Sequence, residues 1–167
     1  MNIAKKIFNF HRNVRSKLQL LSFRLIYKDK FITGSDCYVR KEFSVVIEDE
    51  GRVVLGDRCF FNNNCSVNSL CGITIGNDCI FGENVHIYDH NHRYKNMDIP
   101  INDQGFSYGE VVIGDNCWIG SNVVILKGVT IHNHSVIGAG SVVYKDVPEN
   151  SIMINNKIKK LNDEESR

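Results

Sequence analysis

Residues 113–147 read in sixes: I-G-D-N-C-W, I-G-S-N-V-V, I-L-K-G-V-T, I-H-N-H-S-V, I-G-A-G-S-V and the shorter V-Y-K-D-V. Each unit opens with an aliphatic residue, glycine often comes second, and Cys, Val or Ser takes the fifth position. An α-helical period of 3.6 cannot generate a strict six, and β-alternation alone would not hold glycine at one phase. The repeat therefore predicts an all-β, triangular solenoid, in which each unit is a short strand plus a corner and three units complete a coil.

The same repeat occurs earlier, from Leu55 (L-G-D-R-C-F, F-N-N-N-C-S, V-N-S-L-C-G) and from Ile75 (I-G-N-D-C-I, F-G-E-N-V-H). The first and fifth positions should point into the prism, where the narrow interior at the fifth admits only small side chains. We expect two inward columns, which are Leu55, Ile75, Ile113 and Ile131, and Cys59, Cys79, Cys117 and Ser135. Cys65 and Cys71 share the fifth position, so the cysteines are predicted to be small core residues. The second-position glycines should serve corners that need a permissive backbone.

The repeat is interrupted twice. Leu55 and Ile75 lie twenty residues apart, which places a two-residue excess around residues 71–74. Residues 88–112 break the register completely and are predicted to form a long loop ejected from one corner. Long excursions from a rigid scaffold commonly carry function.

The ends differ from the middle. We expect an amphipathic, basic helix in residues 1–30, the β-helix domain in 31–150 and a C-terminal tail in 151–167 that is polar and frayed beyond Lys157. The apolar stripe of the helix consists of Ile3, Ile7, Phe10, Val14, Leu18, Leu21 and Leu25. This stripe is expected to pack over the open end of the solenoid. Weak contact of the helix with an anionic membrane surface is the alternative.

Composition excludes several classes of protein. The 167 residues suit one domain, and 20 basic against 19 acidic residues give no global argument for nucleic-acid binding. The sequence has no apolar run long enough to cross a membrane and no secretory leader at its start, so a cytoplasmic protein is expected. Six cysteines occur without a C-x-x-C pair, and no metal is expected.

The predicted loop opens with D-H-N-H, which contains His90 and His92. Acyl transfer to a hydroxyl needs a base with a pKa near neutrality, and imidazole is the natural candidate. The sequence has no G-x-S-x-G elbow for a serine nucleophile. These residues permit direct attack by an acceptor on a thioester, with a histidine as general base.

Three features together resemble the hexapeptide-repeat acyltransferases: the loop with its histidines, I-G-D-N-C-W-I-G-S-N-V-V-I-L-K-G-V-T-I, and I-G-A-G-S-V-V-Y-K-D-V-P. The resemblance covers roughly residues 50–150 and is strongest to galactoside, maltose, streptogramin and capsule or lipopolysaccharide O-acetyltransferases. It implies a left-handed parallel β-helix, a homotrimer with active sites between subunits, acetyl-CoA as co-substrate and a saccharide hydroxyl as acceptor.

The resemblance also assigns residues. The spacing from Tyr88 and the N-H-R tripeptide put the family's general base at His92, and His90 is its alternative and a predicted acceptor contact. Asn62 matches an acceptor-binding asparagine of the sugar enzymes. The positions that match acetyl-CoA contacts are Trp118, Ser121, Ala139, Tyr144 and Lys145, where Lys145 is the expected partner of the coenzyme phosphates.

Two departures and three alternatives remain. Leu70 stands where the galactoside enzymes have an acidic acceptor contact, and residues 153–158 replace the usual A-G-x-P-A. An amino-sugar N-acetyltransferase is one alternative. A zinc enzyme similar to the γ-type carbonic anhydrases, using His86, His92 and His132, is another, and a non-catalytic structural β-helix is the third.

Overall fold

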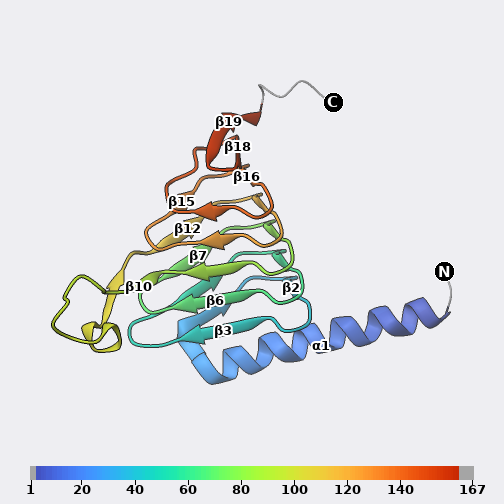
Figure 1. Cartoon of the computed structure of the whole chain (residues 1–167). Helices are drawn as coiled ribbons and strands as arrows, with labels where there is room; N and C mark the ends of the chain where they lie inside the picture. The colour runs from blue at the N-terminus through green and yellow to red at the C-terminus, as the bar shows by residue number, and fades with distance from the viewer. Residues whose placement is uncertain (1–2, 162–167) are drawn as a thin grey trace.

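The protein is a left-handed parallel β-solenoid with one long helix across its N-terminal end (Figure 1). The computed structural model describes residues 3–161, with side chains from Phe10 onward. The coils stack into a three-walled prism that narrows toward the C-terminus. No helix in this part of the chain is long and apolar enough to cross a membrane.

Each wall of the prism is a sheet built from one strand per coil. Sheet A contains β1 (Phe31–Thr33), β4 (Val53–Leu55), β7 (Ile73–Ile75), β12 (Val111–Ile113) and β15 (Thr130–Ile131). Sheet B contains β2 (Tyr38–Val39), β5 (Phe60–Phe61), β8 (Ile80–Phe81), β13 (Trp118–Ile119), β16 (Val136–Ile137), β18 (Ser151–Ile154) and β19 (Lys157–Lys160). Sheet C contains β3 (Ser44–Ile47), β6 (Ser66–Ser69), β9 (His86–Tyr88), β14 (Val124–Ile125) and β17 (Val142–Val143).

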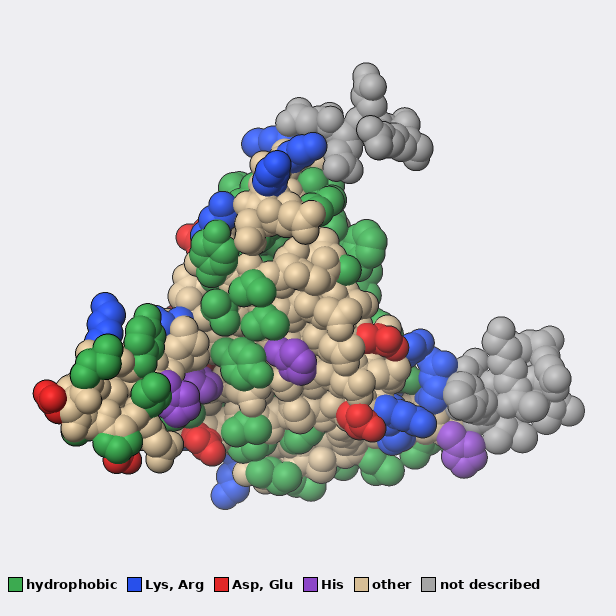
Figure 2. Space-filling view, in the orientation of Figure 1, with side chains coloured by type: hydrophobic (Ala, Val, Ile, Leu, Met, Phe, Trp, Pro, Cys, Tyr) green, Lys and Arg blue, Asp and Glu red, His purple; other side chains and the backbone are tan. Residues whose placement is uncertain are grey.

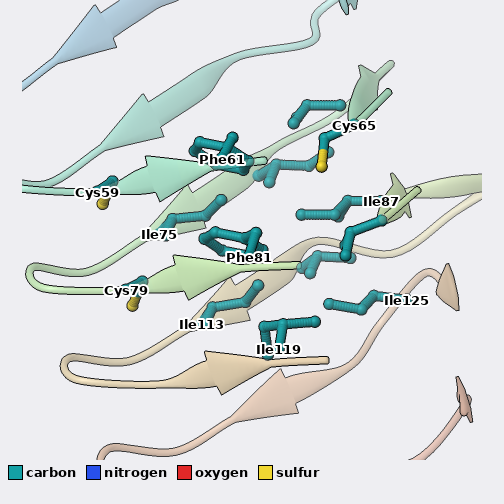
Figure 3. Close-up of a cluster of buried hydrophobic side chains, with 14 of the residues drawn as sticks. Cys59, Phe61, Cys65, Ile75, Cys79, Phe81, Ile87, Ile113, Ile119 and Ile125 are labelled. Carbon is teal, nitrogen blue, oxygen red and sulfur yellow. The ribbon is translucent and has the colours of Figure 1, made fainter. Parts of the chain in front are cut away.

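The two predicted inward columns are present in the core, and Figure 3 labels Cys59 and Cys79 of one column and Ile75 and Ile113 of the other. Leu55, Ile75, Ile113 and Ile131 are register partners in successive coils and are no more than 1% exposed. Cys59, Cys79, Cys117 and Ser135 are equally buried. Beside the cysteines, Phe61 stacks on Phe81 with ring centroids 4.2 Å apart. All six cysteines are free, and Cys71 departs from the prediction because it is half-buried in the bend that takes up the extra residues.

The reason proposed for the second-position glycines was wrong. The left-handed backbone falls two residues later, at the fourth position, where Arg58, Asn116 and Asn122 have φ between 54° and 58°. Gly56 instead lies against the next coil, since a Cβ there would approach the carbonyl carbon of Gly76 to 2.6 Å. Glycine is therefore required for close stacking of the coils, and the asparagines make the turn.

Helix α1 (Ile3–Tyr27), followed by a short 3-10 turn η1 (Lys28–Lys30), covers the open edge of the first coil. Three of its polar side chains satisfy backbone groups of that edge. The Ser16 hydroxyl accepts the Val39 N–H at 2.9 Å, the Gln19 amide donates to the Phe43 carbonyl at 2.6 Å, and the Tyr27 hydroxyl donates to the Val45 carbonyl at 3.0 Å. The helix therefore caps an edge that would otherwise be free to pair with another strand.

The face of α1 that packs is not the predicted one. Leu20 is buried and Phe23 meets the rings of Phe31 and Phe43 edge-on. The described residues of the predicted stripe face solvent: Phe10, Val14, Leu18, Leu21 and Leu25 are 39–70% exposed. Ile3 and Ile7 lie outside the described side chains. The prediction failed because the first coil offers unpaired backbone groups, and the face that packs combines polar side chains that satisfy them with the apolar Leu20 and Phe23.

The C-terminal tail begins with a regular hairpin, and β19 extends to Lys160, past Lys157, where fraying was predicted to begin. Strand β18 pairs in parallel with β16, and β19 turns back antiparallel along β18. Met153 is fully buried and Ile158 packs against the core. Alternating buried residues, not a sixfold repeat, hold this hairpin on the last coil.

Candidate active site

The ejected loop is shorter than predicted and is anchored by a two-stranded ribbon. Strands β10 (His90–His92) and β11 (Phe106–Tyr108) pair antiparallel, with His92 opposite Phe106, and the short helix η2 (Ile101–Gln104) lies between them. Residues 88 and 111–112, which were expected in the loop, belong to β9 and β12. The loop projects from the side of the prism, and histidine side chains gather where it leaves (Figure 2).

Asp89 lies at the base of the loop with a fully buried carboxylate. The hydroxyl of Ser69 donates to it at 2.7 Å, and the backbone N–H groups of Leu70, Cys71 and Gly72 donate at 2.7–3.1 Å. Burial opposes ionisation, but these donors and His90 hold the pKa of Asp89 below its ordinary value. The carboxylate thus fastens the loop to the corner that contains the two extra residues.

His90 is fixed by this carboxylate. Its Nδ1 lies 2.9 Å from Oδ1 of Asp89, and its side chain is 18% exposed. Because an ionised carboxylate only accepts hydrogen bonds, Nδ1 is the donor in this contact. The ring also meets Phe106 edge-on, with centroids 5.3 Å apart.

His92 lies two residues along the ribbon and is exposed. Its ring packs on Phe106 with centroids 4.5 Å apart. It lines an open cavity of about 640 Å³ together with Arg93, Tyr94 and Lys127, among others. His90 is not part of that lining, so only one of the two loop histidines faces the cavity.

Three of the predicted site residues occupy the corner between sheets B and C. Asn62 follows β5, and the Gly120 backbone that precedes Ser121 lies against Ala139 of the next coil. Ala139 is exposed, whereas Ser121 is half-buried and its hydroxyl accepts the Glu83 N–H at 3.1 Å. Ser121 and Ala139 therefore form one small-residue shelf on adjacent coils, and Asn62 lies at the same corner two coils before Ser121.

The other predicted residues lie elsewhere. Tyr144 and Lys145 follow β17 at the corner between sheets C and A, in the coil after Lys127, and both are exposed. Trp118 points outward from β13 on sheet B and is 55% exposed. Within one chain, His92 and the shelf of Ser121 and Ala139 thus lie at opposite ends of the sheet C strands.

Sequence reasoning missed three residues of this site: Asp89, Phe106 and Lys127. Asp89 is the first residue of the D-H-N-H motif and directly precedes His90, so the motif itself was the signal that could have identified it. Phe106 could not be paired with His92 before the register of the ribbon was known. Within residues 3–161 no group of three His, Cys, Asp or Glu side chains is placed to hold a metal ion.

Comparison with known proteins identifies the family of this fold. The family model described as bacterial transferase hexapeptide (six repeats) matches residues 110–145, and the hexapeptide repeat of succinyl-transferase matches residues 52–89. The structure of an acetyltransferase from Vibrio cholerae complexed with acetyl-CoA is similar, with a TM-score of 0.69 and 27% identity over 89% of this chain and 83% of that one. A galactoside acetyltransferase in complex with coenzyme A gives the same TM-score and identity over 89% and 78% of the two chains.

Curated relatives match at higher identity but over different lengths. The galactoside O-acetyltransferase of Escherichia coli is 34% identical over 76% of this chain and 61% of its own length. The match to an acetyltransferase-like protein of Schizosaccharomyces pombe covers only 52% of that protein's length. Another E. coli protein, whose name assigns it provisionally to O-acetyl transfer in lipopolysaccharide biosynthesis, is 33% identical over 92% of this chain and 88% of its own. Because that match extends far beyond the repeats, the chain belongs to the hexapeptide-repeat acetyltransferases.

Proposed function

We propose that the protein transfers an acetyl group from acetyl-CoA to a hydroxyl of a saccharide, and that the reaction takes place in the cytoplasm. The observation that carries the proposal is the loop cavity, where an exposed histidine and Lys127 face open space beside a rigid coil. Relatives named for galactoside, maltose and lipopolysaccharide O-acetylation support a saccharide acceptor.

In this mechanism His92 is the general base. Its imidazole takes the proton of the acceptor hydroxyl as the oxygen attacks the thioester carbonyl. A C–O bond forms, the C–S bond breaks, and the proton passes from the imidazolium to the departing thiolate. Packing against Phe106 holds the ring at the cavity wall without engaging either ring nitrogen.

The chain's corner residues suit a long, phosphorylated co-substrate. The shelf of Ser121 and Ala139 carries no bulky side chain, so an extended ligand could approach the backbone there. Lys145 is exposed and available to a phosphate, and Tyr144 beside it is 56% exposed. Trp118 offers an aromatic face on the neighbouring wall.

The test compares His92→Ala with His90→Ala. Loss of a positioned base should lower kcat by roughly 10²- to 10⁴-fold in His92→Ala. His90→Ala should retain most activity, because that ring contacts Asp89 and not the cavity. If His90→Ala abolishes turnover while His92→Ala does not, the base has been assigned to the wrong histidine. If neither affects acetyl release from acetyl-CoA, histidine-assisted direct attack is wrong for this protein.

We further propose that the active unit is a homotrimer. An outward apolar column runs along sheet B through Tyr38, Phe60, Ile80, Trp118, Val136 and Ile152. Ile80 and Trp118 are 48% and 55% exposed in the single chain. A second chain placed on this wall would cover the column and could bring its shelf to the first chain's loop, which would complete the site.

Light scattering tests this assembly. Wild-type protein should have three times the chain mass, and Ile80→Glu should give monomers with little activity. Ile32→Glu, on the outer face of sheet A where Ile32 is 40% exposed, is the matched control and should remain trimeric. A fully active monomer at micromolar concentration would contradict the proposal.

We also propose that the outward stripe of α1 contacts an anionic lipid surface. The described stripe is flanked by Lys17 and Arg24 on one side and by His11 and Arg15 on the other, and the helix contains no acidic residue. An apolar stripe between cations is the pattern of helices that lie in a membrane interface. Vesicles containing phosphatidylglycerol should bind the protein and neutral vesicles should not, and Leu18→Glu with Leu21→Glu should abolish binding. If that variant instead changes the oligomeric mass, the stripe is a subunit contact.

A further inference from the structure

A second cavity, of about 420 Å³, lies between α1 and the first coils. Its lining consists of His11, Arg12 and Arg15 from the helix, Arg40 and Lys41 from the corner after β2, and Asn63 from the corner after β5. Among the described side chains, from Phe10 to Leu161, no carboxylate lines it. Asn63 of the lining donates a hydrogen bond to the carboxylate of Glu83 at 2.9 Å. The cavity is therefore strongly cationic in a protein whose net charge is only +1.

Two of the cations are held in place by aromatic rings. Tyr38 and Phe60 stack with centroids 5.8 Å apart and planes within 3°. The guanidinium carbon of Arg12 lies 5.7 Å from the centroid of Tyr38, whose hydroxyl accepts from Arg12 Nε at 3.0 Å. The guanidinium carbon of Arg40 lies 5.4 Å from the centroid of Phe60. The stacked rings thus hold the guanidinium groups of Arg12 and Arg40 in place beside the cavity. An anion that binds there would therefore cost little side-chain entropy.

The hydrogen bonding of Arg40 is incomplete. Its Nη1 donates to the Asn62 side-chain oxygen at 3.0 Å, and its Nε is buried without a hydrogen-bond partner within the described structure. Neither Arg40 nor Lys41 forms an ion pair with a described carboxylate. Arg40 and Lys41 thus leave positive charge at the cavity wall that no described carboxylate neutralises, and such a site favours an anionic ligand.

We infer that this cavity binds the phosphate or pyrophosphate group of a phosphorylated saccharide acceptor. Planar guanidinium forks match phosphate oxygens, and the several cations suit a group with more than one negative charge. The side-chain oxygen of Asn62 accepts a hydrogen bond from Arg40, so the cavity adjoins the residue that the family resemblance predicts to contact the acceptor. That the bound molecule is a saccharide rests on the proposed function. That it carries a phosphate or pyrophosphate rests on the cavity alone.

The first experiment measures binding of inorganic pyrophosphate to the full-length protein by calorimetry. The double variant Arg15→Gln, Lys41→Gln should bind roughly 10-fold or more weakly, since charged hydrogen bonds are lost. Lys17→Gln, Lys28→Gln removes the same charge from exposed helix positions outside the cavity and should bind within about 2-fold of wild type. Equal weakening in both variants would mean that general charge binds the anion, and the inference would be wrong.

The second experiment compares acetyl transfer to a panel of hexoses and to their 1-phosphates. The phosphates should have the higher kcat/KM, the cavity variant should lose that advantage, and the KM for acetyl-CoA should not change. A raised KM for acetyl-CoA would instead assign the cavity to the coenzyme phosphates and overturn the inference. If no acceptor is acetylated while pyrophosphate binding still depends on Arg15 and Lys41, the proposed function fails and the anion site stands.

Discussion

Replacing Asp89 with alanine should destabilise the protein severely, because this one buried carboxylate accepts hydrogen bonds from several backbone N–H groups of one corner. Three backbone N–H groups, of Leu70, Cys71 and Gly72, have Asp89 as their acceptor. An unsatisfied buried donor costs about 1–3 kcal/mol, and water can reach part of this half-buried bend. We therefore expect Asp89→Ala to lower the free energy of unfolding by roughly 3–5 kcal/mol.

The free energies of unfolding of wild type and Asp89→Ala are measured by urea titration at one fixed protein concentration. The fluorescence of the single tryptophan reports unfolding. Asp115→Ala is the matched control, since the exposed Asp115 also accepts a backbone N–H, from Asn77 at 2.6 Å, and its loss should cost under about 1 kcal/mol. A change no larger in Asp89→Ala than in the control would refute the reasoning.

The same carboxylate predicts a dependence on pH. The pKa of Asp89 is lower in the folded protein, so its stabilisation is fully present above the unfolded value of about 4 and is lost as the pH falls through the folded value. Asp89→Asn does not titrate. The stability gap between wild type and Asp89→Asn should therefore be constant near neutrality and shrink below about pH 4. A gap that widens on acidification would show that the carboxylate is not the stabilising form.

Three further predictions concern the coenzyme groove, a core thiol and coil stacking. Lys145→Ala should raise the KM for acetyl-CoA about 10-fold with a smaller change in kcat, by steady-state kinetics, and the reverse pattern would contradict a phosphate contact. Burial raises the pKa of Cys65 to about 11, so this thiol should react with Ellman's reagent only after unfolding, and rapid labelling of native protein would count against the core assignment. Gly56→Ala should cost roughly 1–3 kcal/mol or prevent folding, because its Cβ would meet the Gly76 backbone, whereas Gly72→Ala meets only the flexible Glu110 side chain and should be tolerated in thermal unfolding.

The core could be predicted because its information is local. One aliphatic and one small residue recur in each unit, and the register of Leu55 with Ile75 follows from counting alone. The role of Gly56 could not be read in this way, since its reason is a neighbour one coil away. The recurrence of glycine at a position shows that a side chain is disfavoured there. It does not show whether the reason is the backbone conformation or a neighbouring coil that leaves no room for a Cβ.

The site was less predictable for the same reason. His92 could be singled out by a short motif, but Asp89 obtains its partners from a corner seventeen to twenty residues earlier. The helix face was ambiguous because both of its faces contain apolar residues, and Leu20 is buried while Leu21 is not. The cationic cavity is invisible in the sequence, since it forms only where α1 and two coils meet.

The cap that α1 provides has a consequence for how these molecules coexist at high concentration. A parallel solenoid has two unlike ends, and an uncovered end could accept the opposite end of another molecule, so that growth would never close. Ser16, Gln19 and Tyr27 occupy the hydrogen-bonding groups at one end with side chains that cannot propagate a strand. At the other end the antiparallel β19 reverses the direction of pairing. In the described structure, neither end of the solenoid therefore presents an open parallel edge to a further coil. This disfavours end-to-end association of molecules into a filament.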